Sequence, residues 1–533
     1  MARSSSSVAV GTGTKVWTLI TESVASIEAL KAALSASAVV RVAETCNESN
    51  YMQGTVTSLS GTTLTMNITS TGGSGTPTLW VVQTPATTTI THNAGSSALF
   101  TITESTAGSI NISGIRFVNG TGTGNCISHS AASSGYPTLF HDMYFDIGAS
   151  GGSVFIRSSA NRGVLWNCSF SASSGFVQSN FICLQQKDAN ATDVSASTSW
   201  TTASTMGTAD TTGKSNFYVE DCDLHGFAEG ADSDDNGRVV IRYCLLDNSG
   251  MGTHGADTSF YGIRHYEYYN NEFAFVDRGA STFNLSHWLY FRGGTGVVTG
   301  NIMPNISSGY WGDKPEIRVQ VQQLQRNAGP NGGWGVINTS SRSGGWDYPA
   351  PRQVGLGYVT GSATFPAWVS GGPYPGPGAT WSGNYATYSG STYKSTTANT
   401  SSSTPAVNTG QWTNTGYASG SDSVTYIGDS EPLYIWNNTP SGGSLPVFAI
   451  EDYGIDQPSS VSNTDALVTC DVSANYIVLN RDYFMNRSGT STGAKPGYTE
   501  YTYPQPLRTG GGSTTGGSAL GGKITLGGKI TIN

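Results

Sequence analysis

The chain has 533 residues, and only 11% of them are charged, against roughly 25% in an average soluble protein. Its formal net charge of −9 argues against a nucleic-acid-binding protein, because such proteins present a basic surface to the phosphates. Hydrophobic residues make up 37% of the chain, which is enough for a core, and no apolar stretch reaches the roughly 20 residues of a membrane span. We therefore expect a folded protein without a membrane-spanning segment.

The first segment, 1–85, is predicted to form a small, mostly β module. Short runs rich in β-branched residues, such as 54–59 and 62–68, are bounded by Gly, Ser and Asn and indicate strands joined by turns. Helical periodicity is convincing only at 26–37, where apolar residues recur on one stripe. The opening residues 1–7 lack the apolar core of a signal peptide, so no secretory leader is expected.

From Ser113 onward the sequence repeats a five-residue pattern that ends in a large apolar residue. The third positions of these windows are Ile115, Met143, Cys168, Cys222, Cys244, Asn271 and Asn301. Their steps of 28, 25, 54, 22, 27 and 30 residues fit coils of a β-helix, with 54 taken as about two coils that include an insertion at about 188–213. Third and fifth positions are apolar, Cys or Asn, which predicts strands with one face inward. We therefore predict a parallel β-helix over 86–331 rather than leucine-rich repeats.

The cysteines fit this repeat. Seven are present without a CxxC pair, so neither a disulfide framework nor a zinc site is indicated. Cys168, Cys222 and Cys244 share one position of the repeat, and Asn271 and Asn301 continue it. We interpret this column as an internal ladder of buried side chains rather than as a metal or redox trio, because free Cys commonly behaves as a small apolar residue.

The pattern dissolves over 332–428, which is predicted to be an insertion. Residues 353–421 carry one charge, Lys394, among Gly, Pro, Ser, Thr and many aromatic residues. These rings could bind sugars, but packing onto the β-helix or into an interface between chains is the preferred interpretation. Strand signals resume afterwards, so 429–508 is predicted to hold C-terminal coils and a cap. The last segment, 509–533, is a Gly-rich tail with a tandem Gly-Gly-Lys-Ile-Thr repeat.

An ordered set of sequence blocks lies between Ser113 and Pro506. The blocks are Val219–Cys222, Gly237–Tyr243, Gly252–Asp257, Arg264–Phe273, Arg292–Val297, Tyr434–Asn438, Arg481–Phe484 and Lys495–Pro504. This set resembles a family of right-handed parallel β-helix proteins that is common in phage and environmental bacterial sequences, generally without an assigned activity. The resemblance implies an all-β fold, namely a right-handed parallel β-helix with a small N-terminal β module and loop-rich insertions.

A second resemblance concerns the N-terminal module. The segments Ser4–Thr14 and Asn50–Thr65 together resemble a module that recurs in structural proteins of tailed phages. It implies attachment to other virion proteins through residues 1–85, and hence a location in the virion after synthesis in the host cytoplasm. Such appendages are usually homotrimers, and a host surface polysaccharide is the expected external partner.

The densest group of ionisable residues lies at 220–278 and supplies the candidate catalytic residues. If the 22-residue step from Cys222 to Cys244 holds for the whole coil, Asp232 lies one rung from His254 and Asp235 lies one rung from Asp257. Adjacent rungs are about 4.8 Å apart. Two carboxylates at that distance raise the pKa of one of them, which is how glycosidases obtain a general acid beside a base or nucleophile.

Binding is nevertheless preferred over catalysis, because Asp and Asn at turns commonly satisfy backbone donors. The leading hypothesis is a structural virion protein of a tailed bacteriophage, a tail fibre or spike-like appendage that binds a host surface glycan. One alternative is a polysaccharide depolymerase, a glycoside hydrolase or lyase, on the same β-helix. Another is a bacterial extracellular β-helix protein, which the missing signal peptide disfavours. No cofactor is expected, with Ca²⁺ held by Asp residues as an alternative. The arginines available as a lyase base are Arg242, Arg264, Arg278 and Arg292.

Overall fold

The computed structural model describes the chain in segments. They are residues 2–4, 6–19, 39–44, 47–77, 80–83, 88–93, 95–119, 124–132, 135–147, 155–172, 184–186, 205–207, 209–227, 230–233, 237–253, 263–274, 287–304, 317–321, 354–359, 363–364, 367–374, 385–418, 423–424, 428–440, 448–452, 480, 482–485, 493–508, 524–525 and 530–532. These segments are almost entirely β, with one short 3-10 helix at Pro506–Arg508. They contain no helix long and apolar enough to span a membrane. The helix predicted at 26–37 lies outside the described residues.

The N-terminal sheet is antiparallel and has the strand order β1-β6-β3-β4-β5-β2. Its strands are β1 (Ala2–Ser4), β2 (Gly13–Thr18), β3 (Val39–Glu44), β4 (Asn47–Ser60), β5 (Thr63–Gly72) and β6 (Trp80–Gln83). Gly61, with a φ of 57°, allows the tight turn between β4 and β5. Trp17 and Trp80 pack edge to face at 6.2 Å in a core of their own. The sheet therefore has the alternating one-sided burial that its sequence predicts.

The body of the molecule consists of three long parallel sheets. Sheet 1 contains β7 (Thr88–His92), β10 (Ile115–Asn119), β13 (Tyr144–Ile147), β16 (Ser169–Ala172), β19 (Asp223–His225), β22 (Leu245–Asp247), β25 (Glu272–Ala274), β28 (Ile302–Met303) and β38 (Thr439–Pro440). Sheet 2 contains β8 (Phe100–Thr103), β11 (Ile127–Ser130), β14 (Ile156–Ser159), β17 (Leu184–Gln186), β20 (Ala231–Ser233), β23 (Met251–Thr253), β26 (Leu289–Phe291), β29 (Ile317–Val321) and β39 (Phe448–Asp452). Sheet 3 contains β9 (Asn111–Ser113), β12 (Leu139–His141), β15 (Gly163–Trp166), β18 (Phe217–Glu220), β21 (Arg238–Arg242), β24 (His265–Tyr269), β27 (Thr295–Thr299), β37 (Leu433–Trp436) and β40 (Tyr483–Met485).

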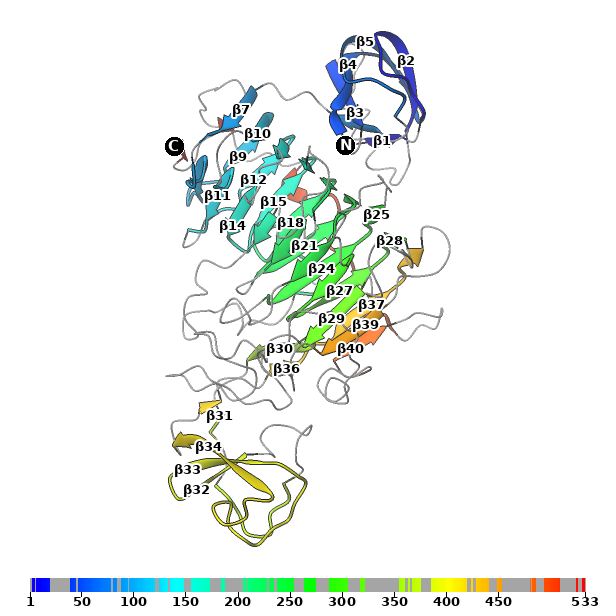
Figure 1. Ribbon diagram of the computed structural model, residues 1–533. Coiled ribbons are helices and arrows are strands. Elements are labelled where there is room, and N and C mark those ends of the chain that lie inside the picture. Colours follow the sequence, from blue (N-terminus) through cyan, green and yellow to red (C-terminus); the bar gives the residue numbers. More distant parts are fainter. Residues whose placement is uncertain are drawn as a thin grey trace.

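Successive strands belong to the three sheets in turn, and each strand from β7 to β26 pairs in parallel with the strand three places further along the chain (Figure 1). Such stacking of coil upon coil is consistent with a parallel β-helix. The predicted windows coincide with sheet 1, where their fifth positions are paired directly. These positions are Phe117, Phe145, Phe170, Leu224, Leu246 and Phe273. The repeat inferred from the sequence is therefore confirmed for these coils.

One coil count is corrected. The 54-residue step was interpreted as about two coils, but Phe170 pairs directly with Leu224, so the step is a single coil. Among the described residues of that coil, β17 is the one strand between β16 and β18. Because β16 pairs with β19 and β15 pairs with β18, the longer step adds no rung to sheets 1 and 3.

A sharp corner joins sheet 3 to sheet 1 in each of these coils. The residue at the corner has a positive φ, and it is Gly114, Asp142, Asn167, Asp221, Tyr243, Asn270, Gly300 or Asn437. Gly, Asn and Asp tolerate this left-handed conformation best, which explains why they recur at the second position of the predicted windows. Tyr243 is the exception, and its φ is 56°.

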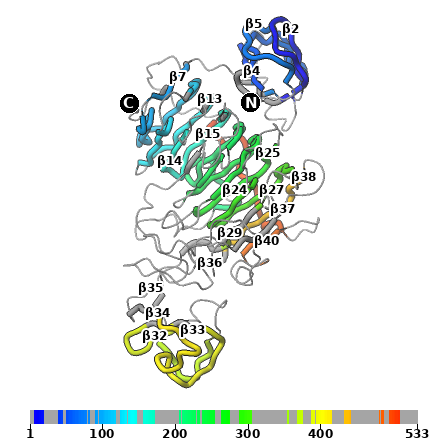
Figure 2. The backbone as a smooth tube through the Cα atoms, in the orientation of Figure 1, coloured from blue at the N-terminus to red at the C-terminus, as the bar shows by residue number. Residues whose placement is uncertain are grey.

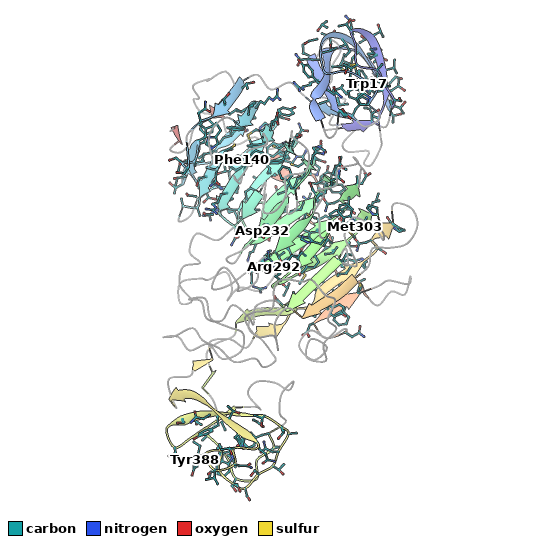
Figure 3. The ribbon with its side chains drawn as sticks, viewed as in Figure 1. Trp17, Phe140, Asp232, Arg292, Met303 and Tyr388 are labelled. Carbon is teal, nitrogen blue, oxygen red and sulfur yellow. The ribbon has the colours of Figure 1, made fainter. Side chains whose placement is uncertain are left out.

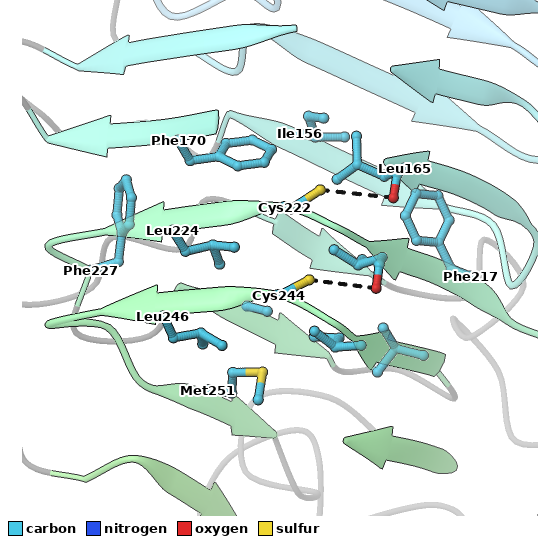
Figure 4. Packing of buried hydrophobic residues seen from close by; sticks show 14 of the residues in the cluster. Ile156, Leu165, Phe170, Phe217, Cys222, Leu224, Phe227, Cys244, Leu246 and Met251 are labelled. Carbon is cyan, nitrogen blue, oxygen red and sulfur yellow. Dashed lines mark hydrogen bonds between the residues drawn. The ribbon is translucent and has the colours of Figure 1, made fainter. Parts of the chain in front are cut away.

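The residue after the corner forms the predicted ladder inside the body. Figure 4 shows the Cys222 thiol directed at the carbonyl oxygen of Leu165, at 3.9 Å, and the Cys244 thiol at that of Val219, at 3.7 Å. Asn271 Nδ2 donates in the same way to the carbonyl of the preceding coil, at 2.9 Å. The described cysteines are free and buried, and burial raises the pKa of Cys244. These repeated contacts on successive coils are those of the predicted ladder. No group of three or more potential metal ligands occurs in the described segments.

A small distal sheet interrupts the last coils. Its strands are β32 (Tyr385–Tyr388), β33 (Ser391–Ser395) and β34 (Trp412–Ala418), which are antiparallel. Two further strand pairs connect it, β30 (Leu356–Val359) with β36 (Gly428–Ser430) and β31 (Ala363–Thr364) with β35 (Ser423–Val424). Because β27 pairs directly with β37, this whole region is an insertion between two neighbouring strands of sheet 3.

The aromatic residues of this insertion build a core of their own. Tyr374, Tyr393 and Trp412 are buried in one cluster, and the rings of Tyr374 and Trp412 lie 4.5 Å apart. The described rings of this cluster pack against one another rather than onto the body, and packing into an interface between chains stays a prediction. Figures 1 and 2 show this distal sheet and the N-terminal sheet at opposite ends of the body.

Candidate functional site

The ionisable residues at 220–278 are separated onto three different outer faces of the body. Side chains alternate between the interior and the outer face along each strand. Asp223 therefore lies on the outer face of sheet 1, Asp232 on that of sheet 2, and Glu267 on that of sheet 3. Residues that are dense in the sequence are thus not one cluster in space.

Asp232 is the one predicted catalytic residue that the structure describes. Asp235, His254 and Asp257 lie outside the described residues. Asp232 is in β20 and is 1% exposed. Its partner on the next rung is Gly252 and not His254, so the predicted register is wrong by two residues.

The cause of this shift is a corner of unequal length. The connection between sheets 1 and 2 has five residues (226–230) in one coil and three residues (248–250) in the next. Strands of sheets 1 and 3 advance by 22 residues between these coils, whereas those of sheet 2 advance by 20. A spacing measured on one sheet therefore cannot be transferred to another.

The outer face of sheet 2 around Asp232 combines acidic, aromatic and basic groups, which we call the Asp232 face. Gly252 stands between Asp232 and Tyr290 in the column, so no side chain separates the two. The Arg292 guanidinium lies 4.8 Å from the centre of the Tyr290 ring, and its Nε donates to the carbonyl of Thr253 at 2.6 Å. Figure 3 labels Asp232 and Arg292 on the same side of the body. A carboxylate, a phenol and a guanidinium are suited to hydrogen bonding and stacking with a sugar.

The outer face of sheet 3 is covered by the segment 493–508, the C-terminal strap. Arg242 lies at the centre of the contact and is fully buried. Its guanidinium pairs with Glu220 and donates to the Tyr269 hydroxyl at 2.7 Å. It also donates to the strap carbonyls of Tyr501 at 2.6 Å and Thr502 at 2.7 Å. Each nitrogen of the buried guanidinium therefore has an acceptor. A buried charge is tolerated when it is paired and hydrogen-bonded in this way.

The strap also contributes polar side chains of its own that bind residues of this face. Arg508 Nη1 lies 2.8 Å from Glu220 Oε2 and 2.5 Å from Asp221 Oδ2. The Tyr503 hydroxyl donates to Asp221 Oδ1 at 2.6 Å. Glu220 is held between Arg242 and Arg508, and Asp221 is held by Arg508 and Tyr503, so these two carboxylates serve the attachment of the strap.

Glu267 lies under the same strap, further along sheet 3. The Tyr498 hydroxyl donates to its Oε2 at 2.6 Å, and His265 Nε2 is 3.4 Å from its Oε1. Burial raises the pKa of Glu267 to about 8. Sequence analysis predicted C-terminal coils and a cap over 429–508 but did not predict this strap, although the tyrosines of the strap lie in the block Lys495–Pro504.

The outer face of sheet 1 carries a Ser-His-Asp column that sequence reasoning missed. Ser171 and His225 are paired on adjacent rungs, as are His225 and Asp247. All three are buried, and His225 Nδ1 is 3.7 Å from Asp247 Oδ2, which is too long for a hydrogen bond. Within the described part of the chain the Ser171 hydroxyl has no hydrogen-bond partner, and burial raises the pKa of Asp247. The column has the order of a catalytic triad but not its hydrogen bonds.

Two of the arginines considered as a lyase base form hydrogen bonds or ion pairs within the molecule. Arg242 is held by the strap, and Arg264 Nη2 lies 2.7 Å from Glu431 Oε2. Arg278 lies outside the described residues. Arg292 is the candidate that shares a face with Asp232.

The comparisons with known proteins give weak structural similarity to phage tailspikes. No protein-family model and no curated protein matches the chain. The Gp54 tailspike of Acinetobacter baumannii bacteriophage AP22, solved in complex with A. baumannii capsular saccharide, is similar with 11% identity and a TM-score of 0.17. The tailspike gp61 of Pseudomonas phage phi297 is similar with 13% identity and a TM-score of 0.14. Each match covers 60% of this chain, which spans 54% of either tailspike chain.

Proposed function

We propose that this chain is a structural virion protein of a tailed bacteriophage, a tail fibre or spike-like appendage that binds a host surface glycan. The observation that supports it is the order of the parts, with the N-terminal sheet at one end of a long stack of parallel sheets and the distal sheet at the other (Figure 1). In this proposal the body is a right-handed parallel β-helix, a shape that holds binding surfaces away from the particle.

Each part has a role in the proposal. Residues 1–85 attach the appendage to other virion proteins, as their resemblance implies. The body is made of 86–331 and 429–508, with 332–428 as its distal insertion and 509–533 as its tail. Three copies assemble into a homotrimer, which light scattering after gel filtration tests directly, and a monomer at micromolar concentration would contradict the trimer.

The glycan is proposed to bind at the Asp232 face. In this proposal Tyr290 contributes an aromatic ring, and Asp232 and Arg292 contribute polar groups beside it; the three side chains are 8%, 1% and 6% exposed, so the ligand has to reach them below the surface. The test is binding of the full chain to immobilised surface polysaccharides from a panel of bacterial strains. Saturable binding to a subset of strains is the expected result, and absence of binding to every polysaccharide would contradict glycan recognition.

Cleavage of the glycan is the second candidate, and the carboxylate of Asp232 on the same face favours it. Asp235, His254 and Asp257 remain predictions as its partners. Incubation with a bound polysaccharide should then release new reducing ends, or an unsaturated sugar if the enzyme is a lyase. Asp232→Asn should abolish release without abolishing binding, whereas equal release by this variant would exclude Asp232 as a catalytic residue.

A further inference from the structure

The tandem repeat in the tail makes contacts that the proposed function does not use. Its copies lie at 521–525 and 527–531. Strand β41 (Ile524–Thr525), from the first copy, pairs antiparallel with β9, and β42 (Ile530–Ile532), which starts in the second copy, pairs antiparallel with β8. The tail therefore crosses the first coil of the body in the reverse direction. In Figure 1 the C-terminus lies beside these first strands.

The register of this pairing matches apolar with apolar residues. Each isoleucine of the two strands is opposite a buried residue of the first coil, and the pairs are Ile524 with Ile112, Ile530 with Ile102, and Ile532 with Phe100. Each threonine is opposite a polar residue, and the pairs are Thr525 with Asn111 and Thr531 with Thr101. A shift by one residue in one direction would break all five matches, and a shift in the other would keep only Ile532 opposite an apolar residue, Leu99, so the pattern favours the observed register.

The first coil needs such a partner. Strands β8 and β9 are the first strands of parallel sheets 2 and 3 that come from the body, and no coil precedes them. An uncovered edge strand presents unpaired N–H and C=O groups to any other chain and invites association. Yet Ile102 and Ile112 are only 1% and 3% exposed, which is as buried as residues in the middle of the body. The tail strands pair with the backbone of the edge strands on which these residues lie.

From this match we propose that the edges of β8 and β9 are a peptide-binding site whose ligand is the chain's own Gly-Gly-Lys-Ile-Thr repeat. Two similar copies of the ligand meet two equivalent strands of one coil. The bound tail closes the body at its N-terminal end and keeps the edge from pairing with neighbouring copies. Among the described residues, β7 of sheet 1 receives no such strand.

Disulfide trapping in the full chain tests the register. Residues opposite each other in an antiparallel pair have Cα atoms about 4.5–5.5 Å apart, which a disulfide accepts. The variant Asn111→Cys/Thr525→Cys should form a disulfide within one chain under mild oxidation, at least about tenfold faster than the mismatched variant Asn111→Cys/Thr531→Cys. The two single variants N111C and T525C control for the seven native cysteines. Equal rates for matched and mismatched pairs, or bonds only between chains, would overturn the proposal.

A second measurement remains informative if the cysteine variants fold poorly. Ile530→Pro/Thr531→Pro removes two of the three N–H groups of β42, the strand that pairs with β8. Hydrogen exchange of the amides of 100–103 should then become at least about tenfold faster, because that edge loses its partner. Ala519→Pro, outside both tail strands, is the control and should leave the exchange unchanged. Unchanged exchange in the double variant would refute a bound tail, whatever the result of glycan binding.

Discussion

The outer faces of sheets 2 and 3 are built from the same coils, but their polar side chains have different partners. On sheet 3 the C-terminal strap covers Arg242 and Glu220 and supplies carbonyl and guanidinium partners for both. On sheet 2 no strap crosses the Asp232 face in the described segments, and Gly252 leaves no side chain between Asp232 and Tyr290. On sheet 3 the described partners come from the strap, whereas on sheet 2 Asp232, Tyr290 and Arg292 are 1%, 8% and 6% exposed without such a strap among the described segments.

This difference shows that a high density of charge in the sequence is a poor guide to a functional site. Glu220, Asp221 and Glu267 belong to the densest segment, but each is bonded to the strap. Buried charges of this kind fix the path of a segment when every partner is present. The sparser Asp232 face is the better candidate for recognition.

Removing the central charge of the sheet-3 face should have the largest effect. Arg242→Met leaves the strap carbonyls of Tyr501 and Thr502 and part of Glu220 without a donor, so we expect a loss of about 3–5 kcal/mol in the free energy of unfolding. Urea denaturation measures it. The matched control is Arg116→Met, because Arg116 pairs with Asp146 at 3.2 Å with 26% of its side chain exposed, and about 1 kcal/mol or less is expected there. Equal losses would contradict the role of the strap.

The pH dependence of stability should report on Glu267. Since burial raises the pKa of this carboxyl to about 8 in the folded chain, the protonated form is favoured by folding. Its contribution is complete below the ordinary pKa near 4.5 and is lost as the pH rises through about 8. The free energy of unfolding should therefore decline between pH 5 and 9, and Glu267→Gln should flatten the decline. Parallel curves for the two proteins would argue against a buried, protonated Glu267.

A smaller loss is expected from the hydroxyl of Tyr501. It donates to the carbonyl of Thr205 at 2.7 Å and accepts from Asn216 Nδ2 at 3.2 Å. Tyr501→Phe removes both of these hydrogen bonds and should cost about 1–3 kcal/mol in the free energy of unfolding. Tyr136→Phe, at an exposed tyrosine, is the control and should change stability by less than about 0.5 kcal/mol. No difference between the two variants would mean that the strap is not held at this point.

The sequence predicted the interior of the body better than its outer faces. Cys222, Cys244 and Asn271 share an environment on successive coils, so stacking repeats their residue type and makes the ladder visible as a period. The partner of Asp232 was mispredicted because the corners 226–230 and 248–250 differ in length, and a repeat carries no information about such changes.

The strap was missed for a different reason. Tyr498 contacts Glu267, and Arg508 contacts Glu220, across more than 200 positions of the chain. No local pattern marks such a contact. The alternating tyrosines of the block Lys495–Pro504 indicate an ordered segment, but they do not show which of the three faces it covers.

The most direct test compares two outward tyrosines, one on each face. Tyr290 lies on the Asp232 face, and Tyr434 lies on sheet 3, where its ring stacks on Phe484 at 5.3 Å. The measurement is the affinity of the full chain for a polysaccharide that it binds, with Tyr290→Ala and Tyr434→Ala side by side. We expect Tyr290→Ala to weaken binding at least about tenfold, about 1.4 kcal/mol, and Tyr434→Ala to leave it unchanged. Loss of binding with Tyr434→Ala but not with Tyr290→Ala would contradict the assignment of recognition to the Asp232 face.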